Sequence, residues 1–171
     1  MTYFALFGLS PSFDIDATQL KQKYRQLQQL HHPDHAEAPE QALAQSSQIN
    51  HAYQTLSAVD SRAAYLLQLQ QQDHHLEQSI GDLDFLQHAL ELREQLEEAE
   101  SAEQLESLRT EVQQWLQSLS REFKIDYQEQ DWAEARDTTR KLRFMQKVLA
   151  DIDKAEDRFD DDLDAAFDDD F

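Results

Sequence analysis

The chain has 171 residues, a formal net charge of −20 at pH 7, no cysteine and only two glycines. The negative charge repels nucleic-acid phosphates and anionic lipid surfaces, so a protein partner with basic or polar groups fits this chain better. Without cysteine, a disulfide, a thiolate nucleophile and cysteine ligation of zinc or an iron–sulfur cluster are all excluded. Two glycines are too few for a phosphate-binding loop of the P-loop or dinucleotide type.

No apolar run in the sequence approaches the roughly 18 residues that a membrane-spanning helix needs. The first residues lack the basic start and the long apolar core of a secretion signal. The sequence therefore predicts a soluble, cytoplasmic protein, and self-repulsion at this net charge favours a monomer.

The composition favours helix throughout, because Gln, Leu, Ala and Glu are abundant while proline, glycine and β-branched residues are scarce. The apolar periodicity predicts helical segments over residues 3–9, 17–30, about 40–58, 62–67, 82–99, 102–120 and 127–157. The polar stretch 70–79, followed by Gly81, separates two groups of helices. We therefore expect an all-α protein with an N-terminal domain (1–72), a linker (73–81) and a C-terminal domain (82–171) with an acidic tail.

In the N-terminal domain, the helix over 17–30 follows two candidate cap residues, Asp14 and Asp16. It ends near His31 or His32, because Pro33 pushes the preceding residue out of helical geometry. One face of this helix is predicted to be buried, and it carries Leu20, Tyr24, Leu27 and His31. Pro39 suits the first turn of the next helix, whose predicted apolar face consists of Ala42, Ile49, Ala52, Tyr53 and Leu56.

Lys21 and Arg25 form a positive strip beside this face, and a turn with the sequence His32-Pro33-Asp34 follows the helix. In such an acidic protein, the strip would steer association with an acidic patch on a partner. A solvated helix face followed by an ordinary Pro-Asp turn is the alternative. A metal site at His31, His32, Asp34 and His35 is disfavoured, because no cysteine or suitably spaced catalytic acid accompanies these side chains.

In the segment 82–99, an apolar face suited to packing carries Phe85, Ala89, Leu92, Leu96 and Ala99. Leu83, Leu86 and Leu90 lie away from this face, next to Gln87 and three glutamates, Glu91, Glu94 and Glu98. Either another part of the protein covers these leucines, or they anchor a partner while the carboxylates orient it. Phe144 lies off the stripe of its own helix, so the same two interpretations apply to it.

The two remaining helical patterns predict antiparallel neighbours in a small helical bundle. Their expected core positions are Leu105, Leu108, Val112, Trp115 and Leu119 in the first, and Trp132, Ala135, Thr139, Leu142, Met145, Leu149 and Ile152 in the second. The aspartate-rich end, from residue 160 onward, is predicted to be a frayed helix end or a tail.

The N-terminal segment resembles J-domains, which dock on DnaK-type chaperones and trigger their ATP hydrolysis. The resemblance rests on residues 3–9, the His32-Pro33-Asp34 turn between two helices, residues 49–56 and residues 62–67. It implies a chaperone-binding site formed by His32, Pro33, Asp34, Lys21, Tyr24 and Arg25. His35 departs from the family, which usually has Lys or Arg after the Asp, and we expect a modest loss of docking.

The whole chain resembles HscB-type co-chaperones of bacterial iron–sulfur cluster assembly, through residues 84–86, 90–94, 139–144 and the final Phe171. The resemblance implies that the C-terminal domain binds the IscU-type scaffold and that the J-domain delivers it to an HscA-type chaperone. The implied scaffold contacts are Leu86, Gln87, Leu90, Glu91, Glu94, Glu98 and Phe144. Gln87 stands where the family often has Met, which puts one apolar contact in doubt. No cofactor or metal is implied.

Two other functions fit parts of the sequence. A general J-domain adaptor would use the exposed leucines to bind many unfolded clients. An enzyme would use the carboxylate runs at Glu97-Glu98 and from residue 160 onward for acid–base or metal chemistry. Because these runs lie on a solvated helix and in an acidic tail, solubility explains them better, and the chain is expected not to be an enzyme.

Overall fold

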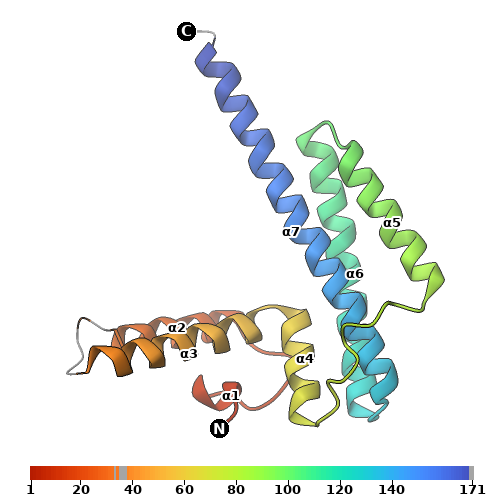
Figure 1. Cartoon of the computed structure of the whole chain (residues 1–171). Helices are drawn as coiled ribbons and strands as arrows, with labels where there is room; N and C mark the ends of the chain where they lie inside the picture. The colour runs from red at the N-terminus through yellow and green to blue at the C-terminus, as the bar shows by residue number, and fades with distance from the viewer. Residues whose placement is uncertain (33, 35–37, 170–171) are drawn as a thin grey trace. The chain divides into compact units, whose positions relative to one another are not determined.

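The structure is a computed structural model that describes residues 1–32, 34 and 38–169. Over these residues it contains helices and no strand, which confirms the all-α prediction (Figure 1). The helices are α1 (Tyr3–Leu6), α2 (Ala17–Leu30), α3 (Pro39–Ser57), α4 (Val59–Leu69), α5 (Leu83–Glu98), α6 (Ala102–Gln128) and α7 (Trp132–Asp169). Of the described helices, none has the length and apolar character that crossing a membrane requires. The chain divides into two compact units, Met1–His74 and His75–Phe171, so the segment 75–81, expected as part of a linker, is grouped with the second unit.

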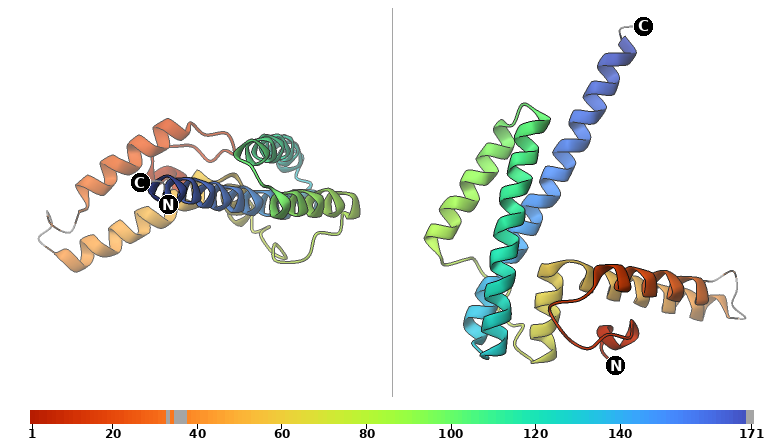
Figure 2. Two further views of the ribbon diagram at one scale, coloured as in Figure 1. Left: turned by 90° about the horizontal axis from the view of Figure 1, so that it is seen from above. Right: turned by 180° about the vertical axis from the view of Figure 1, so that it is seen from behind.

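In the first unit, α2 and α3 lie side by side as a long hairpin, and α1 and α4 pack at its base (Figures 1 and 2). The predicted apolar face of α3 is largely buried here, with Ile49 and Leu56 at 4% and 0% exposed. Of the face predicted for α2, Leu20 is 1% exposed, whereas Tyr24, Leu27 and His31 are only half-buried, as is Tyr53 of α3. The rest of this core comes mainly from Phe4, Phe7, Phe13, Ala52, Ala63, Leu66 and Leu67. Aromatic and aliphatic side chains from all four helices therefore hold the base of the hairpin together.

Local sequence explains where these helices begin and end. The Asp16 carboxylate caps α2 by accepting hydrogen bonds from the backbone N–H groups of Thr18 (2.9 Å) and Gln19 (3.2 Å). Gly8 adopts φ of +68°, and the N–H of Leu9 donates to the carbonyl of Phe4 at 2.8 Å, which closes α1 with a Schellman motif. Both features were expected from the sequence. The helix over 62–67 is longer than predicted, because α4 begins at Val59.

The second unit is a three-helix bundle in which α6 and α7 lie side by side and α5 packs against both (Figures 1 and 2). Its core is formed by Phe85, Ala89, Leu92, Leu105, Leu108, Val112, Leu116, Leu119, Phe123, Ala135, Leu142, Met145, Val148 and Ile152. Trp115, predicted for this core, is only half-buried, and Leu116 takes the core position instead. The rings of Trp115 and Phe85 form a T-shaped pair at a centroid distance of 5.5 Å.

The bounds predicted for the last two helices were wrong. The helix α6 continues to Gln128, and the break lies at residues 129–131, where Gln130 has φ of +59°. The helix continues because Phe123, which is fully buried, extends the core stripe for another turn. At the other end, α7 runs through Asp169 beyond the predicted end at 157, and this part projects past α5 and α6 (Figure 2). The final Phe171 lies outside the described residues.

An ion-pair network joins α6 to the distal half of α7. The guanidinium of Arg109, itself 18% exposed, lies 2.6 Å from a carboxylate oxygen of Asp153 and 2.6 Å from one of Glu156. Although burial opposes its charge, the two carboxylates raise the pKa of Arg109 above its usual value. The network therefore fixes how α7 lies along α6 near the start of its overhanging end.

Candidate functional site

The first candidate site is the turn after α2. The Asp34 N–H donates to Nδ1 of His32 at 3.2 Å, and the Asp34 carboxylate lies 3.4 Å from the same nitrogen. Both side chains are accessible, with exposed fractions of 52% for His32 and 83% for Asp34. Pro33 and His35 lie outside the described residues. The turn thus presents an imidazole and a carboxylate together at the tip of the α2–α3 hairpin.

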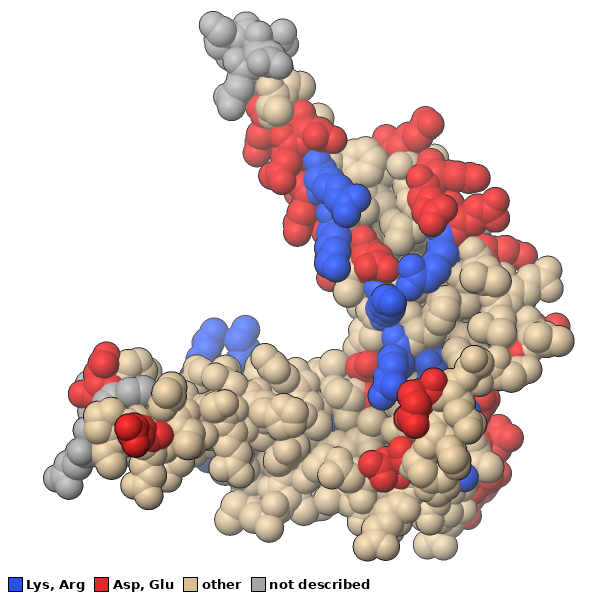
Figure 3. All heavy atoms as spheres, viewed as in Figure 1, with Lys and Arg blue, Asp and Glu red and all other residues tan. Residues whose placement is uncertain are grey.

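The predicted basic strip lies on α2 just before this turn. Lys21 and Arg25 are exposed and one helical turn apart. Lys and Arg side chains stand out on the α2–α3 hairpin, where the view shows few other charges near its middle (Figure 3). In a protein of net charge −20, such a strip gives this unit a local positive potential for an acidic partner.

Tyr24 stands between these cations in the sequence, but its contacts are internal to the hairpin. Its ring stacks on Tyr53 of α3 at a centroid distance of 4.0 Å, and its hydroxyl donates to the Asn50 side-chain carbonyl at 2.6 Å. Gln28 donates to the same carbonyl at 2.9 Å. Tyr24 therefore joins α2 to α3, the two helices of the hairpin whose surface carries Lys21 and Arg25.

The second candidate site is the outer face of α5. Leu83 and Leu90 are 78% and 60% exposed, and Leu86 between them is partly buried. On the opposite side of the helix, Phe85 and Leu92 are 4% and 2% exposed within the bundle. Within the described part of the second unit, Leu83 and Leu90 are thus largely uncovered. Exposed apolar side chains of this size are typical of a partner-binding surface.

Phe144 of α7 is half-buried and contacts side chains of α5. Its ring and that of Phe85 form a T-shaped pair at a centroid distance of 6.2 Å, and the guanidinium of Arg93 lies 5.2 Å from the Phe144 ring centroid. Arg93 is held in turn by Asp151 at 3.2 Å. Leu86 lines the same groove as Phe144, so two of the predicted contact residues meet, although they come from different helices.

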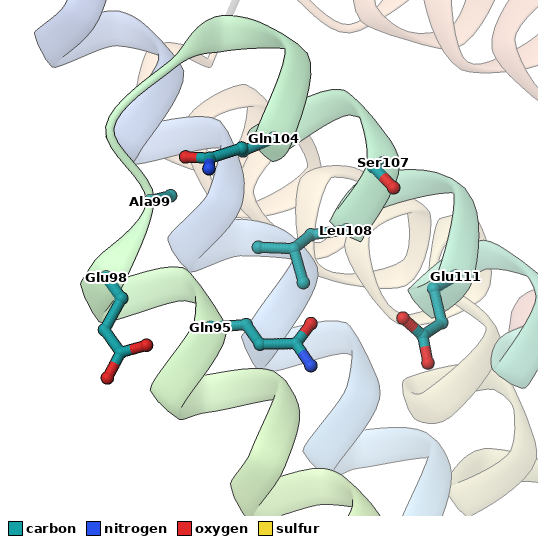
Figure 4. A pocket seen from close by; sticks show the side chains of 7 residues that line it. All are labelled: Gln95, Glu98, Ala99, Gln104, Ser107, Leu108 and Glu111. Atoms are coloured by element: carbon teal, nitrogen blue, oxygen red, sulfur yellow. The ribbon is translucent and has the colours of Figure 1, made fainter.

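The polar members of the predicted set continue along α5. Gln87, Glu91, Glu94 and Glu98 are all exposed, and His88 lies 3.8 Å from the carboxylate of Glu91. Near Glu98, α5 and α6 enclose a small polar pocket of about 300 Å³ (Figure 4). Gln95 and Leu108 point into the space between the helices, whereas the Glu98 carboxylate points away from it. Glu98 therefore adds to the acidic outer edge of α5.

Sequence reasoning missed the side chains that fix the start of the second unit. Nε of Arg140 donates to the His75 carbonyl at 3.1 Å, and Nζ of Lys141 donates to the Asp82 carboxylate at 2.9 Å. Asp82 also caps α5 by accepting from the Phe85 N–H at 3.1 Å. The hydrogen bond from Lys141 is the main reason that the pKa of Asp82 lies below its usual value. Arg140 and His75, like Lys141 and Asp82, are more than 50 residues apart, so no local pattern could reveal these two pairings.

Across the residues that the structure describes, no group of three or more His, Asp or Glu side chains is arranged to hold a metal ion. One member of the metal hypothesis, His35, lies outside those residues. The candidate sites are thus two accessible surfaces, one in each unit. The first carries a turn with a basic strip, and the second carries an apolar face with an acidic edge.

Comparison with known proteins relates both units to one family. A family model described as the DnaJ domain matches residues 2–65, and one described as the HscB C-terminal oligomerisation domain matches residues 81–153. A co-chaperone protein HscB homolog of Acinetobacter baumannii (strain AYE) is 63% identical over 172 residues and covers 100% of both chains. The homolog of Acinetobacter baylyi is 61% identical over 171 residues, again with 100% of both chains covered.

Solved structures show the same relationship. The chaperone HscB from Vibrio cholerae matches with a TM-score of 0.76 and 34% identity, over 93% of this chain and 99% of that one. The human co-chaperone protein HscB matches with a TM-score of 0.77 and 28% identity, over 91% of this chain and 82% of that one.

A J-domain on an all-α chain with these relatives defines a J-domain co-chaperone, a class of protein that works with a DnaK-family chaperone. Within that class, the chain belongs to the HscB family, which takes part in iron–sulfur cluster assembly.

Proposed function

We propose that this chain binds an IscU-type iron–sulfur scaffold, delivers it to an HscA-type chaperone and stimulates ATP hydrolysis by that chaperone. Residues 1–72 dock on the chaperone, and residues 82–171 hold the scaffold. The observation that carries the proposal is the presence of a J-domain and an HscB C-terminal domain on one chain, with relatives of the same length at 63% identity.

On the chaperone side, the proposed docking residues are His32, Pro33, Asp34, Lys21, Tyr24 and Arg25. The exposed cations of α2 suit an acidic patch on the chaperone, and their field raises the rate of encounter. The Asp34 carboxylate is 83% exposed, so it is accessible to a cation on the partner. Tyr24 contributes by holding the hairpin in shape.

On the scaffold side, the proposed contacts are Leu86, Gln87, Leu90, Glu91, Glu94, Glu98 and Phe144. The leucines and the ring of Phe144 supply apolar anchors, whose removal from water on binding is favourable. The glutamates at the rim orient a partner that carries basic groups. Because both sites are on one chain, the scaffold is held near the chaperone at a high effective concentration.

The test is ATP turnover by an HscA-type chaperone, measured with this protein and an IscU-type scaffold added singly and together. We expect strong stimulation only when both are present. The variant His32→Gln should abolish this stimulation while it leaves scaffold binding unchanged, because His32 lies in the turn of the first unit.

Two outcomes would contradict the proposal. Stimulation that is the same with and without the scaffold would favour a general J-domain adaptor for unfolded clients. If the protein does not stimulate ATP hydrolysis by any DnaK-type chaperone, the turn does not dock on such a chaperone.

A further inference from the structure

An open groove lies beside the proposed scaffold surface, between the segment 76–80 and α7. Its volume is about 370 Å³, and its lining is mostly apolar. Leu86 and Phe144 belong both to the groove and to the proposed scaffold contacts. Leu76 and Ile80 extend the apolar lining away from α5. The groove is therefore continuous with the α5 face and enlarges the apolar area that one partner can cover.

The walls of the groove are held in place before any partner binds. Nε of Arg140 donates to the His75 carbonyl at 3.1 Å, and a guanidinium nitrogen of Arg143 lies 3.5 Å from the Leu76 carbonyl. On the other wall, Phe85 and Arg93 fix the ring of Phe144. A groove that is already formed spares its occupant the entropic cost of ordering it, which favours binding.

The rim of the groove is basic, unlike most of this protein. Arg140, Arg143 and Lys147 line it, and Glu77 is the one acidic residue among the lining residues described. Lys147 is exposed, and the described part of the chain gives its ammonium group no ion pair or hydrogen bond. Basic side chains form a row over the middle of α7, whereas acidic side chains dominate the distal part of the same helix (Figure 3).

We propose that this groove is a second contact for the same scaffold and that it takes a segment in which an apolar side chain adjoins one or more carboxylates. The apolar side chain packs on Ile80 and Phe144, and the carboxylates pair with Arg143 and Lys147. This inference rests on the proposed function and adds to it the pattern of charges that the scaffold must carry. The scaffold would present basic groups to the acidic edge of α5 and acidic groups to the basic rim on α7, which fixes its orientation.

Charge and position favour the scaffold over other occupants. A nucleic acid or an anionic membrane would suit the rim but would be repelled by Glu91, Glu94 and Glu98 on the adjoining face. A second copy of this chain also carries a net charge of −20, so long-range repulsion opposes its approach. A scaffold already bound at Leu86 and Phe144 reaches the groove without a separate encounter.

The experiment is an isothermal titration of the full chain with an IscU-type scaffold, comparing Lys147→Glu with Lys154→Glu. Both lysines are exposed on α7 and both changes alter the net charge equally, but Lys154 lies outside the groove. At about 50 mM salt, we expect Lys147→Glu to weaken scaffold binding about three- to tenfold and Lys154→Glu less than about twofold. The difference should shrink at about 0.5 M salt. Equal effects of the two variants would overturn the proposal.

A second pair of variants tests the apolar part. Ile80→Ala should weaken scaffold binding, whereas Ile125→Ala, at an exposed position on α6 outside the groove, should not. If Leu90→Ala weakens binding but neither groove variant does, the proposed function stands and this inference fails. If Leu90→Ala is also without effect, the scaffold-binding function of this unit fails as well. Self-association that Lys147→Glu abolishes, with scaffold affinity intact, would assign the groove to a second copy and refute the proposal.

Discussion

The substitution Leu90→Ala tests whether the outer face of α5 binds the scaffold. Leu90 is 60% exposed, so a partner that covers it fully removes about three fifths of its surface from water. Full burial of a leucine side chain is worth about 1.5–3 kcal/mol, and the exposed share corresponds to about 1–2 kcal/mol. Truncation to alanine should therefore weaken scaffold affinity about five- to thirtyfold. The stability of the unit should hardly change, because alanine is a better helix former and Leu90 lies outside the core.

The assay is an isothermal titration with the scaffold, accompanied by urea denaturation of each variant. Leu43→Ala is the matched control, because Leu43 is 62% exposed on α3 of the other unit, and it should bind the scaffold normally. Leu92→Ala is the structural control, because Leu92 is 2% exposed on the same helix and its truncation should cost about 2–5 kcal/mol of stability. Scaffold affinity of Leu90→Ala that equals the wild type, with helicity intact, would refute the reasoning.

Three further predictions concern stability. Gln130 lies just after the end of α6 with φ of +59°, so Gln130→Gly should raise the free energy of unfolding by about 0.5–1 kcal/mol in urea titrations; a decrease would contradict the strain argument. Burial raises the pKa of Asp126, which lies in the last turn of α6, where a negative charge is unfavourable. In thermal melts, Asp126→Asn should therefore stabilise the protein by about 0.3–1 kcal/mol, because the amide oxygen of asparagine still accepts the hydrogen bond from the Thr138 hydroxyl. A loss of stability would refute this. Because the pKa of Asp82 is lowered in the folded state, its carboxylate contributes stability above the usual value of 3.8, and this stability is lost as pH falls through the folded-state pKa. Between pH 5 and 2, the urea midpoint of Asp82→Asn should therefore fall less than that of the wild type. An identical fall would show that the ion pair with Lys141 does not contribute to stability.

Local sequence was sufficient where local physics decides the structure. The Asp16 cap, the stop at Gly8 and the first turn at Pro39 depend on backbone groups within a few residues, and all three are present as predicted. Helical periodicity likewise identified most of the buried face of α3, because the spacing of 3.6 residues per turn is a property of the chain itself. On α2 it identified Leu20 as buried, but the other three predicted positions are only half-buried.

The ends of the long helices depended on packing between distant segments. The sequence around Lys124 to Asp126 looked like a connection, yet α6 continues because Phe123 is buried in the bundle. The end at Gln130 carries no glycine, so the usual local mark of a helix stop is missing. The continuation of α7 to Asp169 also ran against the expectation from its acidic composition.

The sequence alone identified α5 as a helix with an apolar edge and an acidic edge, and its exposed leucines followed from the helical spacing. Only the tertiary structure brought Phe144 to Leu86 and fixed its ring between Phe85 and Arg93. Only the tertiary structure attached the segment 75–76 to α7 and so formed the groove with the basic rim. The reason is physical: a face of one helix is set by backbone periodicity, whereas a groove between segments about 60 residues apart depends on side-chain pairings that no local pattern encodes.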